Sequence, residues 1–570
     1  LGNGRMGIRG YLSSEPAPRP VQKGLYLAGI FGEIKPGITD FVNLPTPVRE
    51  TVLIDGAEPS LAGDVERSLN LQEATLTIRY TLSANGKRLG IQHQRFLPKD
   101  HTALLLQRLT LIPSADMELT ISSGILPDSC NSPIPDDQTK ANTETVQLSH
   151  PGPAEVSSQG ISCTFSIGGS NLTVNQETTF YCPDFTYIRS EGMAAVYCAS
   201  AKCGQTLILD KISCIRTSRD FDPRISGIPE NWSYDALLAA HRAAWADTWR
   251  NCDLDISAYG EDLQVGLRYA IFQLLGSCSA KDPTVSIGAR GLSHARYKGC
   301  YFWDTDLFML PFFLENDVEA ARNLCDYRVR SLPSAKAHAR KMNAAGARYP
   351  WMASLDGSEQ CETWDIGCSE VHITADVAFA LDTYCKASKD EAFYLDKAAE
   401  VFIETARFWV SRYTYRPETR AADLLFCKGP DEYCGITHNN LFTNVMVQHN
   451  LQLAVQAAKD LQEKRPEQYA RLAVTQEELD HMATLCAVIK WPRDPVTGRL
   501  SQDETLHLLE PVDIAQLKPD DSASYHRVCF DRLQRYKVIK QADVLLLMTR
   551  MPRLFTQEEK AAAWEDFEPI

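Results

Sequence analysis

The feature that most constrains the fold is a change of hydrophobic period near Ile228. Before this point, apolar residues alternate with polar ones in short runs. After it, they recur every three or four residues in long runs. Alternation is typical of strands with one buried face, whereas the longer period is typical of helices. The chain therefore predicts a β-rich first part and an all-helical second part, not an interleaved α/β fold.

The first part carries a hairpin signal. Residues 74–82 alternate, and Asn85-Gly86 then supplies the positive φ angles of a tight turn before a second run at 88–97. Short apolar runs continue at close intervals with Pro, Asn, Asp and Gly between them. Further strands are predicted at 103–112, 117–121, 146–149, 160–167 and 194–200. This spacing predicts an antiparallel β-sandwich.

The second part predicts consecutive helical hairpins. The predicted helices are 234–253, 262–277, 371–386, 391–413, 442–461 and 475–490. On the second of these, the apolar residues from Leu263 and Val265 onward are expected to share one face. Helical hairpins without a strict repeat favour a closed α-toroid over a solenoid. We predict a β-sandwich at 1–225, a helical linker at 226–257 and an all-α domain at 258–570, with the site on loops at one end of the toroid.

Composition excludes several classes of protein. The 570 residues are 44% hydrophobic and 23% charged, as in ordinary globular proteins. Asp and Glu outnumber Lys and Arg by 73 to 58, so nucleic acid and anionic membrane are not expected partners. No apolar run approaches the roughly 18 residues of a membrane span. Seventeen Cys without a Cys-x-x-Cys pair favour a reducing compartment, so a cytoplasmic location is predicted.

One loop combines aromatic and acidic residues. Residues 301–306 read Tyr-Phe-Trp-Asp-Thr-Asp. Carboxylates accept hydrogen bonds from vicinal sugar hydroxyls, and an aromatic face such as that of Trp303 covers the apolar face of a sugar ring. The alternative is that Asp304 or Thr305 caps the following helix while the aromatic side chains are core. From residue types alone, the alternative has the advantage.

A second loop also combines acidic residues with an aromatic one. Gly429-Pro430 makes a turn that is expected to project Asp431 and Glu432 out of regular structure. Partial desolvation by Tyr433 would raise a carboxyl pKa, which suits a general acid. An exposed turn with solvated acids is the alternative, and spacing alone favours it.

A third cluster contains two tryptophans, Trp351 and Trp364, in a polar loop where exposed indoles need a cover. Glu370, His372 and Asp376 follow, and they could hold a metal. No His-x3-His or Cys pair completes such a site, so no metal is predicted. His372 then caps or lines the start of the next helix.

Six ordered motifs together carry a resemblance to a known family. They are Phe302-Trp303-Asp304-Thr305-Asp306, Tyr349-Pro350-Trp351, His372-Ile373-Thr374-Ala375-Asp376, Glu404-Thr405-Ala406-Arg407-Phe408-Trp409, Gly429-Pro430-Asp431-Glu432-Tyr433 and Lys540-Gln541-Ala542-Asp543. In this order they resemble glycoside hydrolase family 65, which contains maltose, trehalose, kojibiose and nigerose phosphorylases and related hydrolases. The resemblance implies a β-sandwich joined by a helical linker to an (α/α)6 barrel catalytic domain. It also favours a sugar site at both acidic loops over the structural alternatives.

The resemblance also implies roles for individual residues. Glu432 matches the general acid that protonates the glycosidic oxygen. The residues that match holders of the glucosyl unit are Trp303, Asp304, Lys540 and Gln541. Residues 357–370 lie where members differ with the acceptor sugar.

Within that acceptor segment, Glu362 and Trp364 are expected to contact the acceptor. Trp351 is expected at the substrate, and His372 to line the pocket and no more. The acceptor itself and its linkage do not follow from residue types.

The implied reaction is inverting phosphorolysis of an α-linked glucose disaccharide to β-D-glucose 1-phosphate, with inorganic phosphate as co-substrate and no other cofactor. A phosphorylase needs only the acid because phosphate arrives as an anionic nucleophile, whereas an inverting glucosidase also needs a base. In the family's phosphorylases, a segment rich in His and Ser after the Lys-Gln motif holds the anion. Since that segment is not found before Ile570, the barrel is expected to be incomplete at its C-terminal end, and the chain to start inside the family's N-terminal region.

Three alternatives stay open on this basis. The first is an inverting α-glucosidase of the same fold. The second is a sugar-binding relative without catalysis, against which the intact loop around Glu432 argues. The third is a chain that requires a companion C-terminal segment for activity. Family members are often dimers, so a homodimer is also expected.

Overall fold

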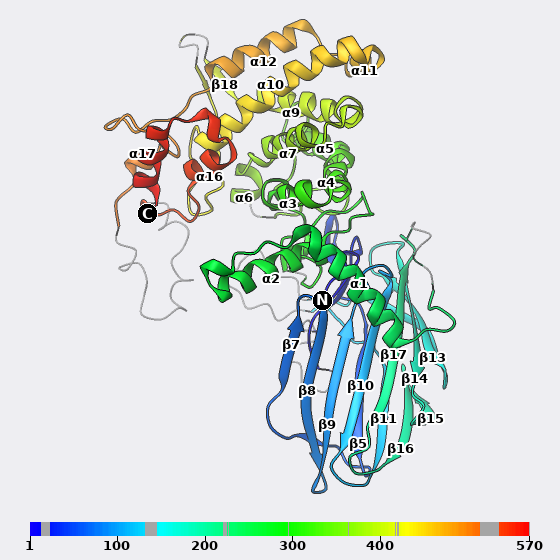
Figure 1. Cartoon of the computed structure of the whole chain (residues 1–570). Helices are drawn as coiled ribbons and strands as arrows, with labels where there is room; N and C mark the ends of the chain where they lie inside the picture. Colours follow the sequence, from blue (N-terminus) through cyan, green and yellow to red (C-terminus); the bar gives the residue numbers. More distant parts are fainter. Residues whose placement is uncertain are drawn as a thin grey trace. The chain divides into compact units, whose positions relative to one another are not determined.

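The computed structural model describes residues 1–12, 23–131, 145–220, 225, 227–294, 296–362, 364–416, 418, 421–512 and 535–568, with only the backbone for 364–366. The chain divides into two compact units (Figure 1). The described residues up to Cys300 form the first unit, and those from Tyr301 onward form the second.

Two antiparallel sheets dominate the first unit. The nine-stranded sheet has the order β12 (Ser149–Val156), β13 (Gly160–Ile167), β14 (Thr173–Tyr181), β17 (Leu207–Thr217), β10 (Leu104–Pro113), β9 (Lys87–Phe96), β8 (Thr75–Ala84) and β6 (Ser60–Leu61), with β7 (Glu66–Asn70) also paired to β8. The four-stranded sheet has the order β15 (Thr186–Glu191), β16 (Ala194–Ala201), β11 (Met117–Leu126) and β5 (Thr46–Ile54). The described part of the unit also contains two small two-stranded sheets, β1 (Met6–Ile8) with β2 (Leu25–Leu27) and β3 (Phe31–Lys35) with β4 (Ile38–Phe41).

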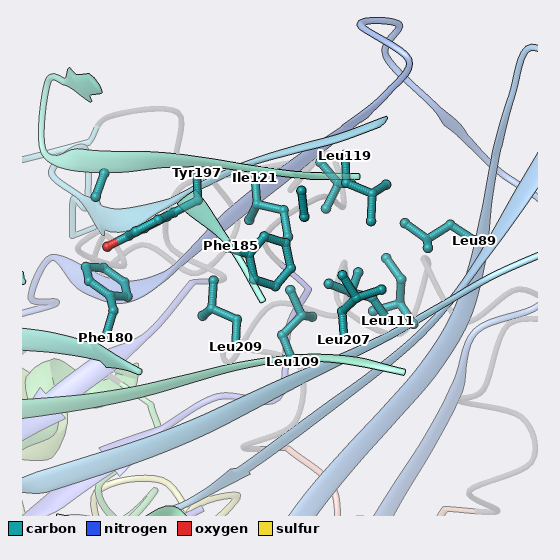
Figure 2. Close-up of a cluster of buried hydrophobic side chains, with 14 of the residues drawn as sticks. Leu89, Leu109, Leu111, Leu119, Ile121, Phe180, Phe185, Tyr197, Leu207 and Leu209 are labelled. Carbon is teal, nitrogen blue, oxygen red and sulfur yellow. The ribbon is translucent and has the colours of Figure 1, made fainter. Parts of the chain in front are cut away.

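A hydrophobic core lies between the two large sheets (Figure 2). Leu109 and Leu207 enter it from the larger sheet, and Leu119, Ile121 and Tyr197 enter it from the smaller one. All five are at most 1% exposed. The alternating pattern predicted this arrangement, and the sandwich is confirmed.

The predicted hairpin is present between β8 and β9. Asn85 and Gly86 have φ angles of 53° and 75°, and Ala84 pairs with Lys87 across the turn. Positive φ at both central positions matches the twist of the two strands. This is why Asn-Gly occupies the turn.

The α-helices in the described part of the first unit are α1 (Tyr234–Cys252) and α2 (Glu261–Ser277), and they match the predicted ranges closely. Tyr234 of α1 packs edge-on against Phe96, with ring centroids 5.4 Å apart. The expectation that Leu263 and Val265 share one packed face is wrong, because they are 58% and 52% exposed. Residues two apart point about 200° away from each other around a helix, so they cannot share a stripe.

Helices make up most of the second unit, as predicted. They are α3 (Leu310–Asn316), α4 (Val318–Arg330), α5 (Leu332–Lys341), α6 (Trp364–Ser369), α7 (Ile373–Ser388), α8 (Glu391–Phe393), α9 (Ala399–Arg412), α10 (Leu441–Lys464), α11 (Pro466–Leu472), α12 (Gln476–Val488), α16 (Asp543–Arg550) and α17 (Gln557–Phe567). Two π-helical turns, η4 (Thr305–Met309) and η5 (Tyr394–Ala398), interrupt the regular geometry. A small hairpin of β18 (Thr414–Arg416) and β19 (Ala421–Asp423) lies between α9 and α10.

The long helix α10 packs against α7, α9 and α12. Two of the helices begin at motifs singled out in the sequence: α7 directly after His372, and α16 shortly after Gln541. These starts support the expectation that the site lies on loops before helices. In the described part of the chain, no helix is long and apolar enough to cross a membrane.

Candidate active site

The aromatic and acidic loop passes directly into helical structure. Trp303 and Asp304 are already helical, and the π-helical turn η4 follows them directly. Within the described residues, the Asp304 side chain makes no capping hydrogen bond to this helix. Trp303 is half-buried, with its ring edge-on to His372 at 4.9 Å and to Phe308 at 5.2 Å between centroids. The capping interpretation of Asp304 is therefore not supported.

The second acid of this loop has a structural partner. Asp306 is buried and forms a two-pronged ion pair with Arg328, at 3.0 Å from Nε to Oδ1 and 2.5 Å from Nη2 to Oδ2. The same guanidinium donates to the carbonyl of Phe302 at 3.1 Å. Such a fork is a strong, oriented interaction. Asp306 thus fixes the loop, and Asp304 is the carboxylate that is not used in this way.

Asp304 lies in an electrostatic environment that disfavours its charge. Burial raises the pKa of Asp304, and the negative charges of Asp306 and Glu432 raise it further. The geometry agrees, because the ring of Trp303, next to Asp304, lies edge-on to Phe442 of α10 at 6.3 Å between centroids, and α10 follows the loop of Glu432. Two motifs that are more than a hundred residues apart in sequence therefore meet at one site.

The loop around Glu432 is built on a close backbone approach at Gly429. A Cβ atom there would lie 2.2 Å from both Asn440 Nδ2 and Asp543 Oδ2, so no larger residue fits. The preceding Lys428 pairs in parallel with Glu370, which joins this loop to the segment before α7. The sequence motif is therefore a packing requirement as well as a chemical one.

Glu432 contacts both residues of the Lys-Gln motif. Its Oε2 accepts a hydrogen bond from Lys540 Nζ, and its side chain is 43% exposed. Gln541 accepts from the Glu432 backbone N–H at 3.2 Å and donates to Glu432 Oε1 at 3.5 Å. The structure thus brings three of the predicted residues together at one half-exposed carboxylate.

Asp431, the acid next to Glu432, is buried in the protein. Asp431 is 1% exposed and accepts hydrogen bonds from four N–H groups. The expectation that the Gly-Pro turn projects both acids outward is therefore right for Glu432 and wrong for Asp431. The burial raises the pKa of Asp431, and these donors compensate part of the cost.

Trp351 lies beside the first loop, with its ring edge-on to Phe302 at 4.9 Å. Its backbone N–H donates to Glu359 Oε2 at 2.8 Å, and Oε1 of the same residue accepts from Met352 and Cys361, each at 3.0 Å. Glu359 is thus a carboxylate that folds this loop. No sequence pattern marks it for this role.

The two residues expected at the acceptor are less defined. Glu362 is exposed, and Trp364 opens the short helix α6, with its side chain outside the described part of the structure. Their assignment to the acceptor stays a prediction.

His372 is fully buried and therefore lies behind Trp303, not on an open pocket wall. Its Nδ1 is 2.6 Å from Asp376 Oδ2, and its Nε2 is 4.0 Å from Glu370 Oε2. Its ring also meets Phe442 edge-on at 5.7 Å. Across the described ranges, no group of three His, Cys, Asp or Glu residues is arranged to hold a metal ion.

Sequence reasoning missed several residues that position the site. Asn440 caps α10 by accepting from the Thr443 N–H at 3.0 Å, and an Asn before an apolar run is a signal that could have found it. Gln502 links Asp431 to Asp543, and no pattern in its surroundings indicates this. Only the folded structure brings these distant residues together.

Comparison with known proteins places this architecture in a family. The model of the glycosyl hydrolase family 65 central catalytic domain matches residues 268–570, and that of the family's N-terminal domain matches residues 1–248. The chain belongs to glycosyl hydrolase family 65. The match spans both units and includes every motif described above.

Relatives of the family 65 chain carry several names. A kojibiose phosphorylase of Caldanaerobacter subterraneus subsp. tengcongensis is 29% identical, over 100% of this chain and 78% of that protein. An alpha,alpha-trehalose phosphorylase of Geobacillus stearothermophilus is 35% identical over 52% of this chain and 39% of its own length. A solved protein of the human microbiome, described provisionally as a kojibiose phosphorylase, has a TM-score of 0.86 at 20% identity and covers 100% of this chain and 77% of its own. At that identity, the structural match shows the shared fold.

Proposed function

We propose that this protein is a disaccharide phosphorylase that transfers the glucosyl unit of an α-linked glucose disaccharide to inorganic phosphate. The observation that carries the proposal is the meeting of Glu432, Lys540 and Gln541 at one half-exposed carboxylate near Asp304. The names of the relatives support the reaction class, since they include kojibiose, trehalose and maltose phosphorylases.

In the proposed reaction, protonated Glu432 donates its proton to the glycosidic oxygen as the bond between that oxygen and the anomeric carbon breaks. A phosphate oxygen attacks the anomeric carbon from the opposite face. The products are the acceptor sugar and β-D-glucose 1-phosphate, with inverted configuration. Phosphate is already an anionic nucleophile, so one protein acid suffices, whereas a hydrolase would also need a base to activate water.

The roles around the acid follow from residue chemistry. Trp303 has an aromatic face of the kind that covers a sugar ring, and its edge-on contacts with His372 and Phe308 fix its plane. Asp304 would accept hydrogen bonds from glucosyl hydroxyls, while Lys540 and Gln541 would donate to them from beside Glu432. We place Glu362 and Trp364 on the acceptor side and Trp351 at the substrate.

The proposal is tested by incubating the protein with kojibiose, nigerose, maltose and trehalose, each with and without phosphate. We expect glucose 1-phosphate to form from at least one of them only when phosphate is present, and as the β-anomer in the proton NMR spectrum. Glucose release at full rate without phosphate would instead show the hydrolase. No turnover of any disaccharide under either condition would favour a binding protein.

The proposal also includes phosphate as co-substrate without an organic cofactor or metal, a homodimer, and action in the cytoplasm. Activity that survives dialysis against a chelator, and a mass in solution of twice 63.6 kDa, would support the first two. Loss of activity on chelation, or a mass of one chain, would contradict them.

A further inference from the structure

Asp431 is a buried carboxylate that the proposed reaction does not use. Its Oδ1 accepts from the backbone N–H groups of Tyr433, Lys540 and Gln541, at 3.1, 3.0 and 3.4 Å. Its Oδ2 accepts from Gln502 Nε2 at 3.1 Å. One side chain therefore ties the loop of the catalytic acid to two segments that are 71 and about 110 residues further along the chain.

The hydrogen bonds behind Asp431 have a fixed direction. Gln502 accepts the backbone N–H of Asp543 through Oε1 at 3.1 Å, so its amide N–H2 must face Asp431. Asp543 in turn accepts from Asn440 Nδ2 at 2.7 Å. Each polar partner is thus assigned as donor or acceptor, and Asp431 must present two accepting oxygens.

The position of Asp431 is costly for a purely structural residue. It is 1% exposed, and two further buried carboxylates, Asp503 and Asp543, lie in the same region at 1% and 0% exposure. Burying like charges together is unfavourable unless each is well hydrogen-bonded. A neutral side chain would avoid that cost, but it could not accept from all four donors.

We propose that Asp431 is a positioning residue for the catalytic acid. It holds the backbone of Lys540 and Gln541 against the loop of Glu432, and the side chains of those two residues then orient the Glu432 carboxylate. This inference rests on the proposed function, in which Glu432 is the general acid. It extends that function by naming what sets the acid's geometry.

The fixed donor and acceptor roles of these hydrogen bonds can be tested by exchanging them between Asp431 and Gln502. In Asp431→Asn, one oxygen becomes an N–H2 group, which faces either Gln502 Nε2 or the three backbone N–H groups. In Gln502→Glu, a carboxylate oxygen faces Asp431 Oδ2. The double variant Asp431→Asn with Gln502→Glu restores a donor opposite an acceptor and keeps an acceptor for the Asp543 N–H.

The experiment measures kcat and KM on the disaccharide used by the wild type and on α-D-glucosyl fluoride, both with phosphate. Fluoride leaves without needing a proton, so a misplaced acid has little effect on it. We expect each single variant to lose at least about tenfold in kcat on the disaccharide, since positioned acid catalysis contributes about 10²–10⁴-fold. We expect a loss below threefold on the fluoride, and recovery of the double variant to within about threefold of the wild type on the disaccharide.

Controls separate this inference from the proposed function. Glu432→Gln should show the same preference for the fluoride; if it keeps normal turnover of the disaccharide, the acid assignment itself fails, whatever the Asp431 variants do. Asp382→Asn is the matched control, because Asp382 is a buried aspartate on α7 paired with Lys386 at 2.7 Å, and it should leave both rates unchanged.

Three results would overturn the inference: normal disaccharide turnover in Asp431→Asn, an equal loss on both substrates, or no recovery in the double variant. Circular dichroism and Tm establish that each variant is folded. If Asp431→Asn does not fold, Gln502→Met removes one of the four donors at similar volume and is judged by the same ratio of the two losses.

Discussion

Removing the Asp304 carboxylate should impair every substrate alike. Within the described residues Asp304 makes no capping bond, and its carboxylate is under the electrostatic influence of Glu432, where the glucosyl unit is proposed to bind. A hydrogen bond from a neutral hydroxyl to a charged group contributes about 1.5–3 kcal/mol. At 1.4 kcal/mol per tenfold, Asp304→Ala should therefore lower kcat/KM by about 10- to 150-fold for each bond lost.

The same change should not destabilise the fold. Burial raises the pKa of Asp304, which means that the folded protein holds the charged carboxylate less well than the unfolded chain does. Above that raised pKa, replacing the carboxylate by a methyl group removes an unfavourable term, so Tm should stay constant or rise. A capping residue behaves in the opposite way.

Asp317→Ala supplies the matched control. Asp317 caps α4 by accepting from the Ala320 N–H at 3.0 Å. Loss of such a cap costs about 1 kcal/mol, which lowers Tm by about 2–4 °C in a unit of this size. Turnover by this variant should be normal.

Calorimetry of both variants, together with initial rates on two disaccharides, tests this reasoning. If Asp304→Ala lowers Tm as Asp317→Ala does and keeps its kcat/KM, then Asp304 is structural and our placement of the glucosyl unit is wrong. If the loss is confined to one acceptor, Asp304 belongs to the acceptor side.

Three further predictions can be tested on the same protein. Glu432→Gln cannot donate a proton, so turnover of the disaccharide should fall by at least about 10²-fold with an unchanged circular dichroism spectrum; near-normal turnover would remove Glu432 from the acid role. Trp364→Ala should change which acceptors are used in synthesis while affinity for glucose 1-phosphate changes much less. Equal losses for donor and acceptor would contradict its placement. Burial beside Phe96 lowers the pKa of His241 from 6.5 to about 4. Between these values the unfolded chain binds a proton that the folded protein does not, so acid favours unfolding. The free energy of unfolding should therefore be unaffected by His241 above pH 6.5 and fall by up to about 3 kcal/mol as the pH drops to 4. In His241→Gln the Tm measured over this range should fall less steeply, and a slope equal to that of the wild type would disprove the role of His241.

Strands were predictable from sequence where the buried face is apolar. The run at 160–167 became β13 with its predicted limits, because Ile161, Cys163, Phe165 and Ile167 all point into the core. The adjacent β14 has the same alternation of burial, but its inward positions include Gln176 and Thr178.

Each of those two polar side chains makes a hydrogen bond, Gln176 to the segment before β5 and Thr178 to the neighbouring strand β17 of the same sheet. Gln176 donates to the Pro45 carbonyl at 2.7 Å, and Thr178 lies 2.9 Å from the Ser213 hydroxyl. A hydrophobic pattern cannot mark a strand whose inward residues are hydrogen-bonded polar groups. The sequence pattern does not reveal β14, because the hydrogen-bond partners of its inward polar residues are distant in sequence.

The candidate site shows a related limit. Its loops were recognisable, because Gly-Pro turns and aromatic residues beside acids are local features. The division of roles between neighbouring acids was not, because it depends on partners elsewhere: Arg328 pairs with Asp306, and Gln502 with Asp431. Adjacent carboxylates are chemically equal until the fold supplies those donors.

The same arrangement occurs in both acidic loops. In each, one carboxylate is buried and takes N–H donors from other segments, while its neighbour keeps access to the site: Asp306 beside Asp304, and Asp431 beside Glu432. A flexible loop could not keep a sugar ligand and an acid within the few tenths of an ångström that catalysis requires. This explains why each loop carries two acids, since the buried acid fixes the backbone that positions its more exposed neighbour. Under the proposed function, the buried acids Asp306 and Asp431 are therefore part of the catalytic geometry even though they need never touch the sugar.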